Sequence, residues 1–116
     1  MIVDQIARAI SRQEGPNNRN NPGNLRWAGQ IGASSSGLGG EPPLAKFSSL
    51  GLGVVGLYRQ IWADIARGDT LRQLIWSWAP PSENNSDQYA LNVANWTGLP
   101  LDVPLVDLVE QEWTGS

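Results

Sequence analysis

Cysteine and histidine are both absent from the 116 residues of this chain. Without cysteine there is no disulfide, so the sequence carries no sign of a redox compartment. Nucleophilic catalysis by Cys–His or Ser–His–Asp groups is excluded, and so are typical zinc hydrolase sites, which need His or Cys ligands. We therefore expect neither a metal nor a cofactor. If the chain is a hydrolytic enzyme, carboxylates must carry the acid–base chemistry, and glycoside cleavage is the main reaction class that needs nothing else.

Basic clusters and long apolar runs are missing as well. The 8 Lys and Arg residues are scattered and the formal net charge is -3. A nucleic-acid partner is not expected, because such binding depends on clustered positive charge. No apolar run approaches the roughly 20 residues that span a bilayer, so we expect no stable membrane insertion. The N-terminus, Met1 to Asp4, does not look like a signal peptide, which predicts delivery by other means if the protein acts outside the cytoplasm.

Helical spacing of apolar residues is what the chain does have, and its length suits one domain over residues 1–116. Ile2, Ile6 and Ile10 are four residues apart, which puts them on one face of a helix predicted over residues 2–14. Gly15-Pro16 ends this helix. Similar spacing and end residues predict four more helices: from a Ser49 cap to about Arg67, from an Asp69 or Thr70 cap through Trp78, from a Ser86 cap to Gly98, and from Pro104 through Trp113.

A long polar segment, residues 16–48, separates the first two predicted helices. It is rich in Asn, Gly, Ser and Pro and has no helical period, and so long an irregular stretch is usually functional or mobile. Residues 24–28 and 44–48 look like edge strands of a hairpin, with Ser34 to Gly40 as its tip. The sequence thus predicts a mainly α fold of about five helices, with a small hairpin in a long polar loop after the first helix.

Glu14 is the candidate general acid. It continues the isoleucine series of its helix by four residues, so it should lie near the buried face, with about 40° of drift per step. It also lies in the last turn, at the negative end of the helix dipole. Burial and the dipole both disfavour the ionised carboxylate, and a general acid must hold a proton. On periodicity alone, an exposed acid at a fraying helix end is the simpler interpretation. That position is unfavourable for stability, however, and a catalytic role would explain it.

Two groups of polar and aromatic residues follow. The first runs from Asn17 to Arg26 and holds five asparagines and two arginines, a density of donors and acceptors that suits sugar hydroxyl and N-acetyl groups. Asparagines also stabilise turns, which explains some of them without a ligand. Trp27 either stacks on a sugar face or covers the core. The second group, Trp76 to Tyr89, has two tryptophans and a tyrosine on either side of an Asn-rich turn after a double proline, and these rings are either core or ligand contacts.

A set of short motifs covers nearly the whole chain. They are Glu14-Gly15, Asn20 to Arg26, Lys46 to Ser49 with Gly51, Trp78 to Asn85 with Tyr89, and Thr97-Gly98. With these motifs the chain resembles the lysozyme-like proteins of tailed-phage virions and prophages. That family is similar in organisation to lytic transglycosylases and goose-type lysozymes, in which a catalytic Glu ends a helix, a polar loop or hairpin follows, and a later helix brings a Tyr to the site.

The resemblance implies roles for individual residues. Glu14 matches the catalytic acid and Tyr89 the site tyrosine. Residues expected to contact the substrate or shape its site are Asn21, Asn24, Arg26, Trp27, Glu83 and Asn85. The implied reaction is cleavage of peptidoglycan between N-acetylmuramic acid and N-acetylglucosamine, as a muramidase or a lytic transglycosylase. The implied location is the virion, or the periplasm and cell wall after delivery, with glycan strands and other virion or secretion-machine proteins as partners.

Two mechanisms and two other functions stay open at this point. A lytic transglycosylase needs only one acid, whereas an inverting hydrolase needs a second carboxylate, roughly 6.5–9.5 Å from the first, to activate water. Glu41 and Glu83 are the candidates for that second acid. A glycan-binding or structural virion protein with the same fold need not cleave anything. A helical protein-interaction domain is a further alternative, and it requires the tryptophans to form an exposed apolar patch.

Overall fold

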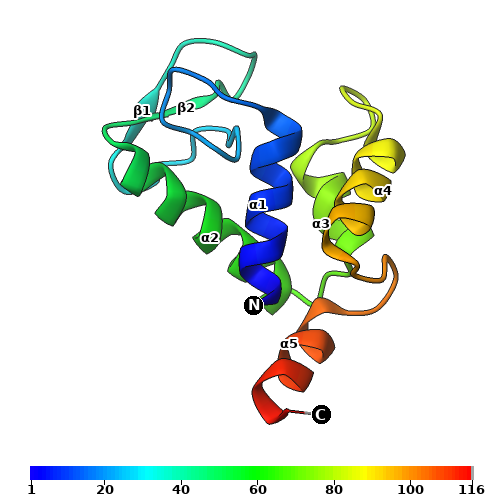
Figure 1. The fold of residues 1–116 in the computed structure, drawn as a ribbon. Coiled ribbons are helices and arrows are strands. Elements are labelled where there is room, and N and C mark those ends of the chain that lie inside the picture. The colour runs from blue at the N-terminus through cyan, green and yellow to red at the C-terminus, as the bar shows by residue number, and fades with distance from the viewer. Residues whose placement is uncertain (116) are drawn as a thin grey trace.

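The computed structural model describes residues 1–115, which form five helices and a two-stranded antiparallel sheet. The helices are α1 (Ile2–Glu14), α2 (Leu50–Ala66), α3 (Leu71–Trp78), α4 (Ser86–Thr97) and α5 (Leu105–Thr114), and the strands are β1 (Ala33–Ser35) and β2 (Ala45–Phe47). Helix α1 stands between α2 and the sheet on one side and α3 and α4 on the other (Figure 1). The mainly α fold with a small hairpin after the first helix is therefore confirmed.

The starts of α2 and α3 follow from side-chain caps. The Ser49 hydroxyl accepts a hydrogen bond from the Leu52 N–H at 3.2 Å, as expected for an N-cap. Thr70, and not Asp69, caps α3. It forms a capping box with Gln73, in which each side chain binds the backbone of the other residue.

The start of α4 corrects the predicted cap. Asn85 is the N-cap residue, and its side-chain oxygen accepts from the Gln88 N–H at 3.2 Å. Ser86 is the first helical residue instead. It is buried, and its hydroxyl donates to the carbonyl of Ala79. The serine therefore ties the start of α4 to the end of α3, while the asparagine next to it does the capping.

The hairpin also differs from the prediction. Strand β2 pairs with β1, with Ala33 opposite Phe47 and Ser35 opposite Ala45. Residues 24–28 contribute a single bridge, between Arg26 and Leu44, and are not a strand. The two predicted segments do lie together, but the ladder partner is a short Ala-Ser-Ser segment. These residues have little of the β-branched or aromatic character of strands, so their composition does not predict a strand.

Two hydrophobic cores of different size hold the molecule. The large one lies among the helices and includes Ile6 and Ile10 of α1, both fully buried. The small one contains Leu25, Ala45 and Phe47 and lies under the hairpin. We call residues 15–49 the hairpin lobe and the five helices the helical lobe. Burying one large aliphatic side chain stabilises by about 1.5–3 kcal/mol, so the hairpin lobe has few such contributions of its own.

Glycines in α2 let the hairpin lobe pack closely against that helix. A Cβ atom at Gly53 would lie 1.7 Å from the Asn20 carbonyl oxygen, and one at Gly56 would lie 2.8 Å from the Phe47 ring. Neither position accepts a larger residue without moving the loop. Glycine in a helix interior costs about 1 kcal/mol relative to alanine. The two glycines therefore lower the helix propensity of α2, but they allow the hairpin lobe to approach its backbone closely.

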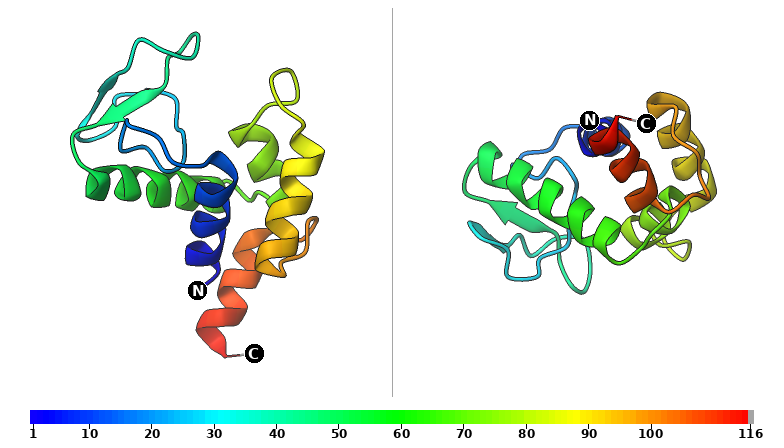
Figure 2. Two further views of the ribbon diagram at one scale, coloured as in Figure 1. Left: turned by 45° about the horizontal axis from the view of Figure 1, so that its top comes forward. Right: turned by 90° about the horizontal axis from the view of Figure 1, so that it is seen from below.

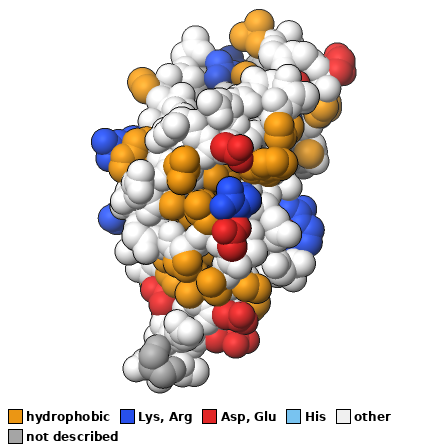
Figure 3. All heavy atoms as spheres, turned by 90° about the vertical axis from the view of Figure 1, so that its right-hand side faces the viewer, with side chains coloured by type: hydrophobic (Ala, Val, Ile, Leu, Met, Phe, Trp, Pro, Cys, Tyr) orange, Lys and Arg blue, Asp and Glu red, His pale blue; other side chains and the backbone are white. Residues whose placement is uncertain are grey.

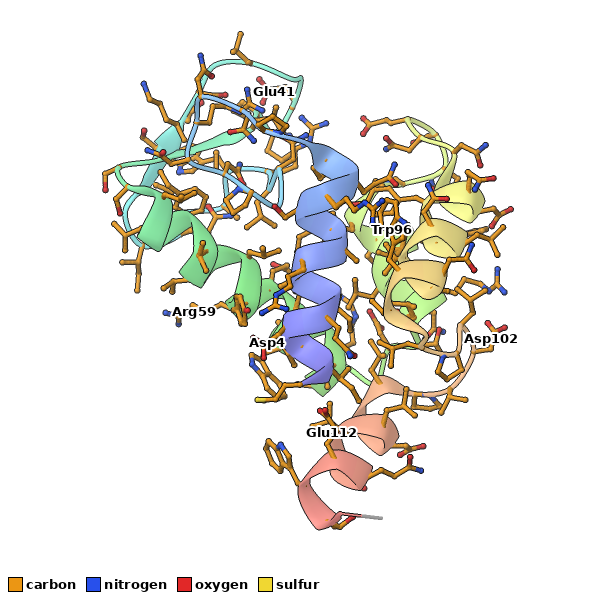
Figure 4. All side chains as sticks on the ribbon, in the orientation of Figure 1. Asp4, Glu41, Arg59, Trp96, Asp102 and Glu112 are labelled. Atoms are coloured by element: carbon orange, nitrogen blue, oxygen red, sulfur yellow. The ribbon has the colours of Figure 1, made fainter. Side chains whose placement is uncertain are left out.

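Helix α5 packs against the start of α1 and runs on beyond it (Figure 2). The Glu112 carboxylate, labelled in Figure 4, accepts hydrogen bonds from the Ile2 N–H at 3.0 and 3.1 Å. A carboxylate there is favourable because the N-terminus of a helix is its positive end. In the part of the chain that the structure describes, no helix has the length and apolarity needed to cross a membrane.

The exposed tryptophans do not gather on one element. Trp27 is in the hairpin lobe, while Trp76, Trp96 and Trp113 belong to three different helices. Seen from the side of α3 and α4, hydrophobic side chains gather in groups with a few charged side chains among them (Figure 3).

Candidate functional site

A cleft of about 710 Å³ lies between the hairpin lobe and the helical lobe. This volume is within the ~300–1,000 Å³ typical of small-molecule sites. Glu14, at the end of α1, is part of its wall. The hairpin lobe contributes Asn24, Leu25 and Arg26, and the connection between α3 and α4 contributes residues 82–84. The predicted position of Glu14, in a cleft between the first Asn-rich loop and the second, is therefore confirmed.

The Glu14 carboxylate is half-buried and held by two neutral donors. The Asn24 side-chain amide donates to Oε1 at 3.1 Å, and the Tyr89 hydroxyl donates to Oε2 at 2.8 Å. No ion pair within residues 1–115 involves Glu14. The two hydrogen bonds thus fix the orientation of the group in the cleft wall.

Tyr89 supports Glu14 from the protein side of the cleft. It lies in the first turn of α4 and is 5% exposed, and it is not among the cleft-lining residues. Burial raises the pKa of the Tyr89 hydroxyl, and the neighbouring Glu14 carboxylate raises it further. The hydroxyl therefore remains a protonated donor over the whole range in which proteins are active. The prediction that Tyr89 faces Glu14 is confirmed.

Asn24 is held by a residue that the sequence did not single out for the site. The Arg19 guanidinium donates to Asn24 Oδ1 at 2.9 Å, which leaves the amide NH₂ to face Glu14. Asn24 has a φ of 51°, in the left-handed region that few residues other than glycine adopt. Its backbone N–H donates to the carbonyl of Asn21 at 3.0 Å. No local pattern predicts the contact between Arg19 and Asn24, because it depends on how the loop turns.

Three of the predicted substrate-binding residues do not line the cleft. Asn21 is 1% exposed and holds the hairpin lobe together: its amide donates to the carbonyls of Leu25 and Ala45, and its oxygen accepts from the Leu25 N–H. Asn85 is the cap of α4. Trp27 is 40% exposed on the outside of the lobe. Asn21 and Asn85 therefore shape the backbone on either side of the cleft.

Arg26 and Glu83 do line the cleft, from opposite lobes. Their guanidinium and carboxylate groups are 3.5 Å apart, and both side chains are exposed. Arg26 also donates to the Pro42 carbonyl at 3.2 Å, which ties it to its own lobe. Glu41 lines the cleft from the loop between the strands, at the outer end of the hairpin lobe (Figure 4). Both candidates for a second acid thus belong to the cleft wall.

Trp78 provides the aromatic wall that Trp27 does not. It is half-buried at the end of α3 and lines the cleft. Its indole N–H donates to the Gly23 carbonyl at 2.8 Å, and it packs against the small core that contains Leu25. The sequence marked Trp78 as part of an aromatic turn but did not distinguish a core role from a ligand contact. In the structure the Trp78 ring packs against the small core and also forms part of the cleft wall.

Asp64 is a cleft residue that the sequence analysis missed. It lies on α2 with its side chain 2% exposed, and Gln60, Arg67 and Ser77 line the cleft beside it. Burial raises the pKa of the Asp64 carboxyl, and a hydrogen bond from Gln60 and the charge of Arg67 oppose this. A detectable sign was present, because the spacing of Asp64 from Ile61 and Ile65 puts it near the apolar face of its helix.

Residues 1–115 contain no group of three or more His, Cys, Asp or Glu side chains arranged to hold a metal ion. No protein-family model, curated protein or solved structure matches this chain. The functional argument therefore depends on the geometry of the cleft and on the sequence motifs.

Proposed function

We propose that this chain cleaves the glycan strands of bacterial peptidoglycan between N-acetylmuramic acid and N-acetylglucosamine, with Glu14 as the general acid. The observation that carries the proposal is the Glu14 carboxyl group, which faces an open cleft and is held by hydrogen bonds from Asn24 and Tyr89. In a chain without His or Cys, a carboxyl group is the suitable acid near neutral pH. The indole of Trp78 and the amides around it suit the faces and polar groups of a sugar chain.

In the route with one acid, two proton transfers take place at Glu14. Its carboxyl group protonates the glycosidic oxygen as the bond to the anomeric carbon breaks, and the resulting carboxylate then takes a proton from the nucleophile. In a lytic transglycosylase this nucleophile is the 6-hydroxyl of the muramoyl unit, which closes a 1,6-anhydro ring. In an inverting hydrolase, water attacks with help from a second carboxylate, for which Glu41 and Glu83 are the candidates. We favour the route with one acid, because it needs only Glu14.

The sequence motifs support the same proposal. A helix that ends in Glu14, a polar hairpin and a later helix that carries Tyr89 follow one another in the order that the resemblance to lysozyme-like proteins implies. On that resemblance we further propose that the protein acts in a virion, or in the periplasm and cell wall after delivery. Its partners would be glycan strands and other virion or secretion-machine proteins.

The decisive variant is Glu14→Gln, which keeps the shape of the side chain but has no acidic proton. General acid catalysis typically contributes about 10²–10⁴-fold, so release of soluble fragments from purified sacculi should fall by about that factor. Folding should not suffer, because a negative charge is removed from the negative end of a helix. Mass spectrometry of the fragments distinguishes 1,6-anhydro ends, made by a transglycosylase, from reducing ends, made by a hydrolase.

Two further variants serve as comparisons. Glu83→Gln removes an exposed carboxylate from the same cleft, and in the one-acid route it should keep most of the release. Tyr89→Phe removes one hydrogen bond to Glu14 and should lower release less than Glu14→Gln does. Equal release by wild type and Glu14→Gln would rule out Glu14 as the acid. Binding of sacculi by the wild type without any release would replace the proposal with the glycan-binding alternative.

A further inference from the structure

The cleft continues along α2 and α3, away from the hydrogen bonds that hold Glu14. Gln60, Asp64 and Ser77 line this part, together with Arg67 at the end of α2. We call these four residues the α2–α3 side of the cleft. Asp64 differs from the others because its side chain is almost entirely buried, whereas that of Arg67 is 54% exposed.

The two oxygens of the Asp64 carboxylate have unequal surroundings. Gln60 donates to Oδ1 at 3.0 Å, and the Arg67 guanidinium is 3.2 Å from the same atom. Among the described residues nothing forms a hydrogen bond with Oδ2. The only fully enclosed side-chain polar atom without a partner in residues 1–115 is Arg19 Nε, so Asp64 Oδ2 retains access to the cleft.

The pairing of this carboxylate leaves one oxygen open. Buried polar groups almost always bond to protein donors, whereas Oδ2 has no such donor and is not fully enclosed, so its hydrogen bond comes from a group in the cleft. Asp69, two residues beyond Arg67, illustrates the satisfied case. It is also buried, but both of its oxygens accept from Arg67, at 3.1 and 2.5 Å, and it does not line the cleft. The free oxygen of Asp64 therefore indicates a ligand group that donates a hydrogen bond.

We propose that Asp64 binds a saccharide unit next to the cleavage site, with Oδ2 accepting a hydrogen bond from a hydroxyl or N-acetyl N–H group of the glycan. This inference rests on the proposed function, because it takes the glycan as the occupant of the cleft. An acidic ligand is disfavoured, because the cleft wall carries four carboxylates, of Glu14, Glu41, Asp64 and Glu83, and only two arginines. A neutral sugar has the required donors, and Trp78 in the same wall offers a face for it.

The test compares Asp64→Asn with Asp69→Asn in steady-state release of fragments from purified sacculi. Asn at position 64 keeps an oxygen for Gln60 and Arg67 but places an NH₂ group where Oδ2 faces the ligand. A hydrogen bond to a charged group contributes enough to binding that KM should rise about tenfold, with kcat unchanged within about twofold. Asp69 is a partner of the same arginine but does not itself line the cleft, so Asp69→Asn should leave KM within about twofold of the wild type.

A binding measurement separates this inference from the proposed function. Isothermal titration of an N-acetylglucosamine hexamer into the Glu14→Gln protein should give a Kd that Asp64→Asn weakens about tenfold and Asp69→Asn does not. An unchanged KM and Kd for Asp64→Asn, or equal losses in both aspartate variants, would overturn the role of Asp64 and leave the proposed function intact. If the wild type neither binds nor cleaves sacculi, the proposed function itself fails.

Discussion

The two lobes that form the cleft are built by different forces. In the helical lobe, apolar side chains such as Ile10 are fully buried in a core to which all five helices contribute. In the hairpin lobe, asparagine amides bind the backbone instead. Asn17 donates to the Asn21 carbonyl at 2.8 Å, Asn20 donates to the Phe47 carbonyl at 3.1 Å, and Asn21 makes three buried hydrogen bonds. Apolar packing is not directional, whereas hydrogen bonds fix the orientation of a loop.

This difference suits the tasks of the two lobes. The helical lobe has to provide stability and a rigid support for Glu14 and Tyr89. The hairpin lobe has to hold an irregular backbone in one conformation, so that the Asn24 amide meets Glu14 at 3.1 Å. Three buried apolar residues cannot hold the loop in one conformation by packing alone. The hydrogen bonds of the asparagine side chains to the backbone provide the remaining interactions.

The largest expected effects are losses of stability that distinguish the apolar core of the helical lobe from the hydrogen bonds of the hairpin lobe. Ile10→Ala removes a buried side chain of the helical lobe and should lower the free energy of unfolding by about 2–5 kcal/mol. Asn21→Ala leaves the buried Leu25 N–H and Ala45 carbonyl without their Asn21 partner, at about 1–3 kcal/mol for each, while the Leu25 carbonyl still accepts from the Ala45 N–H. Hydrogen exchange measured by mass spectrometry should increase throughout the protein for the first variant, and mainly in residues 17–48 for the second.

Asn18→Ala is the matched control, because Asn18 lies in the same loop but is exposed. It should leave exchange and stability unchanged, whereas Asn21→Ala should also lower fragment release, since Asn24 depends on the same loop. If Asn21→Ala increased exchange in α3 and α4 as much as in the hairpin lobe, the two lobes would not be held by separable interactions.

An intermediate effect on stability is expected from Asp64, a buried carboxylate in the helical lobe. Burial raises the pKa of Asp64 in the folded state, so the folded protein binds this proton more tightly than the unfolded chain, whose Asp pKa is about 3.9. Ionisation of Asp64 therefore reduces stability as pH rises from about 4 through the folded pKa, and by a constant amount above it. Asp64→Asn should raise Tm relative to wild type at pH 7, and this difference should shrink toward zero as pH falls to about 4.

The measurement is a paired series of thermal midpoints for the two proteins between pH 4 and pH 8. Other carboxylates titrate equally in both proteins, so the difference reports Asp64. The positive charge of Arg67 is not left unpaired in the variant, because Asp69 still accepts from it. A difference in Tm that is independent of pH, or a variant less stable at pH 7, would contradict the assignment of the pKa shift to burial.

The smallest effect concerns the ion pair that joins the lobes across the cleft. Arg26 and Glu83 are exposed, so their coupling in a double-mutant cycle should be only about 0.2–1 kcal/mol. Screening should remove most of it at 1 M salt, where the Debye length is about 3 Å. Arg26→Ala, Glu83→Ala and the double variant, unfolded by urea at low and high salt, provide the measurement. A coupling well above this range would show that the ion pair, and not packing, sets the spacing of the lobes.

The fold was largely predictable because its determinants are local. Four-residue spacing predicts α1 from Ile2 to Glu14, and Ser49 and the Gly98 break mark helix ends. The hairpin register was not predictable in the same way. Strand β1 is an Ala-Ser-Ser segment whose pairing depends on the loop folding back over α2, and no short pattern records this.

The residues of the candidate site likewise fall into those that local sequence could identify and those that it could not. Glu14 and Tyr89 could be identified because Glu14 ends a helix, Tyr89 lies in the first turn of another, and both belong to motifs that carry the resemblance. Arg19 and Asp64 could not, since the contact of Arg19 with Asn24 depends on how the loop turns and the sequence only suggests the burial of Asp64. Trp78 was noticed but not assigned, because a half-buried indole has the same sequence context whether or not it faces a cleft.

The glycines of α2 have a consequence for how the cleft forms. The segment from Leu50 to Leu57 has glycine at positions 51, 53 and 56, and a helix so poor in propensity is marginal until something covers it. The hairpin lobe covers this segment, because Asn20 lies against Gly53 and Phe47 against Gly56. The start of α2 and the hairpin lobe therefore form as one cooperative unit, and Asn24 reaches Glu14 in the same step. Opening the cleft by peeling the lobe away would also unwind the first turns of α2.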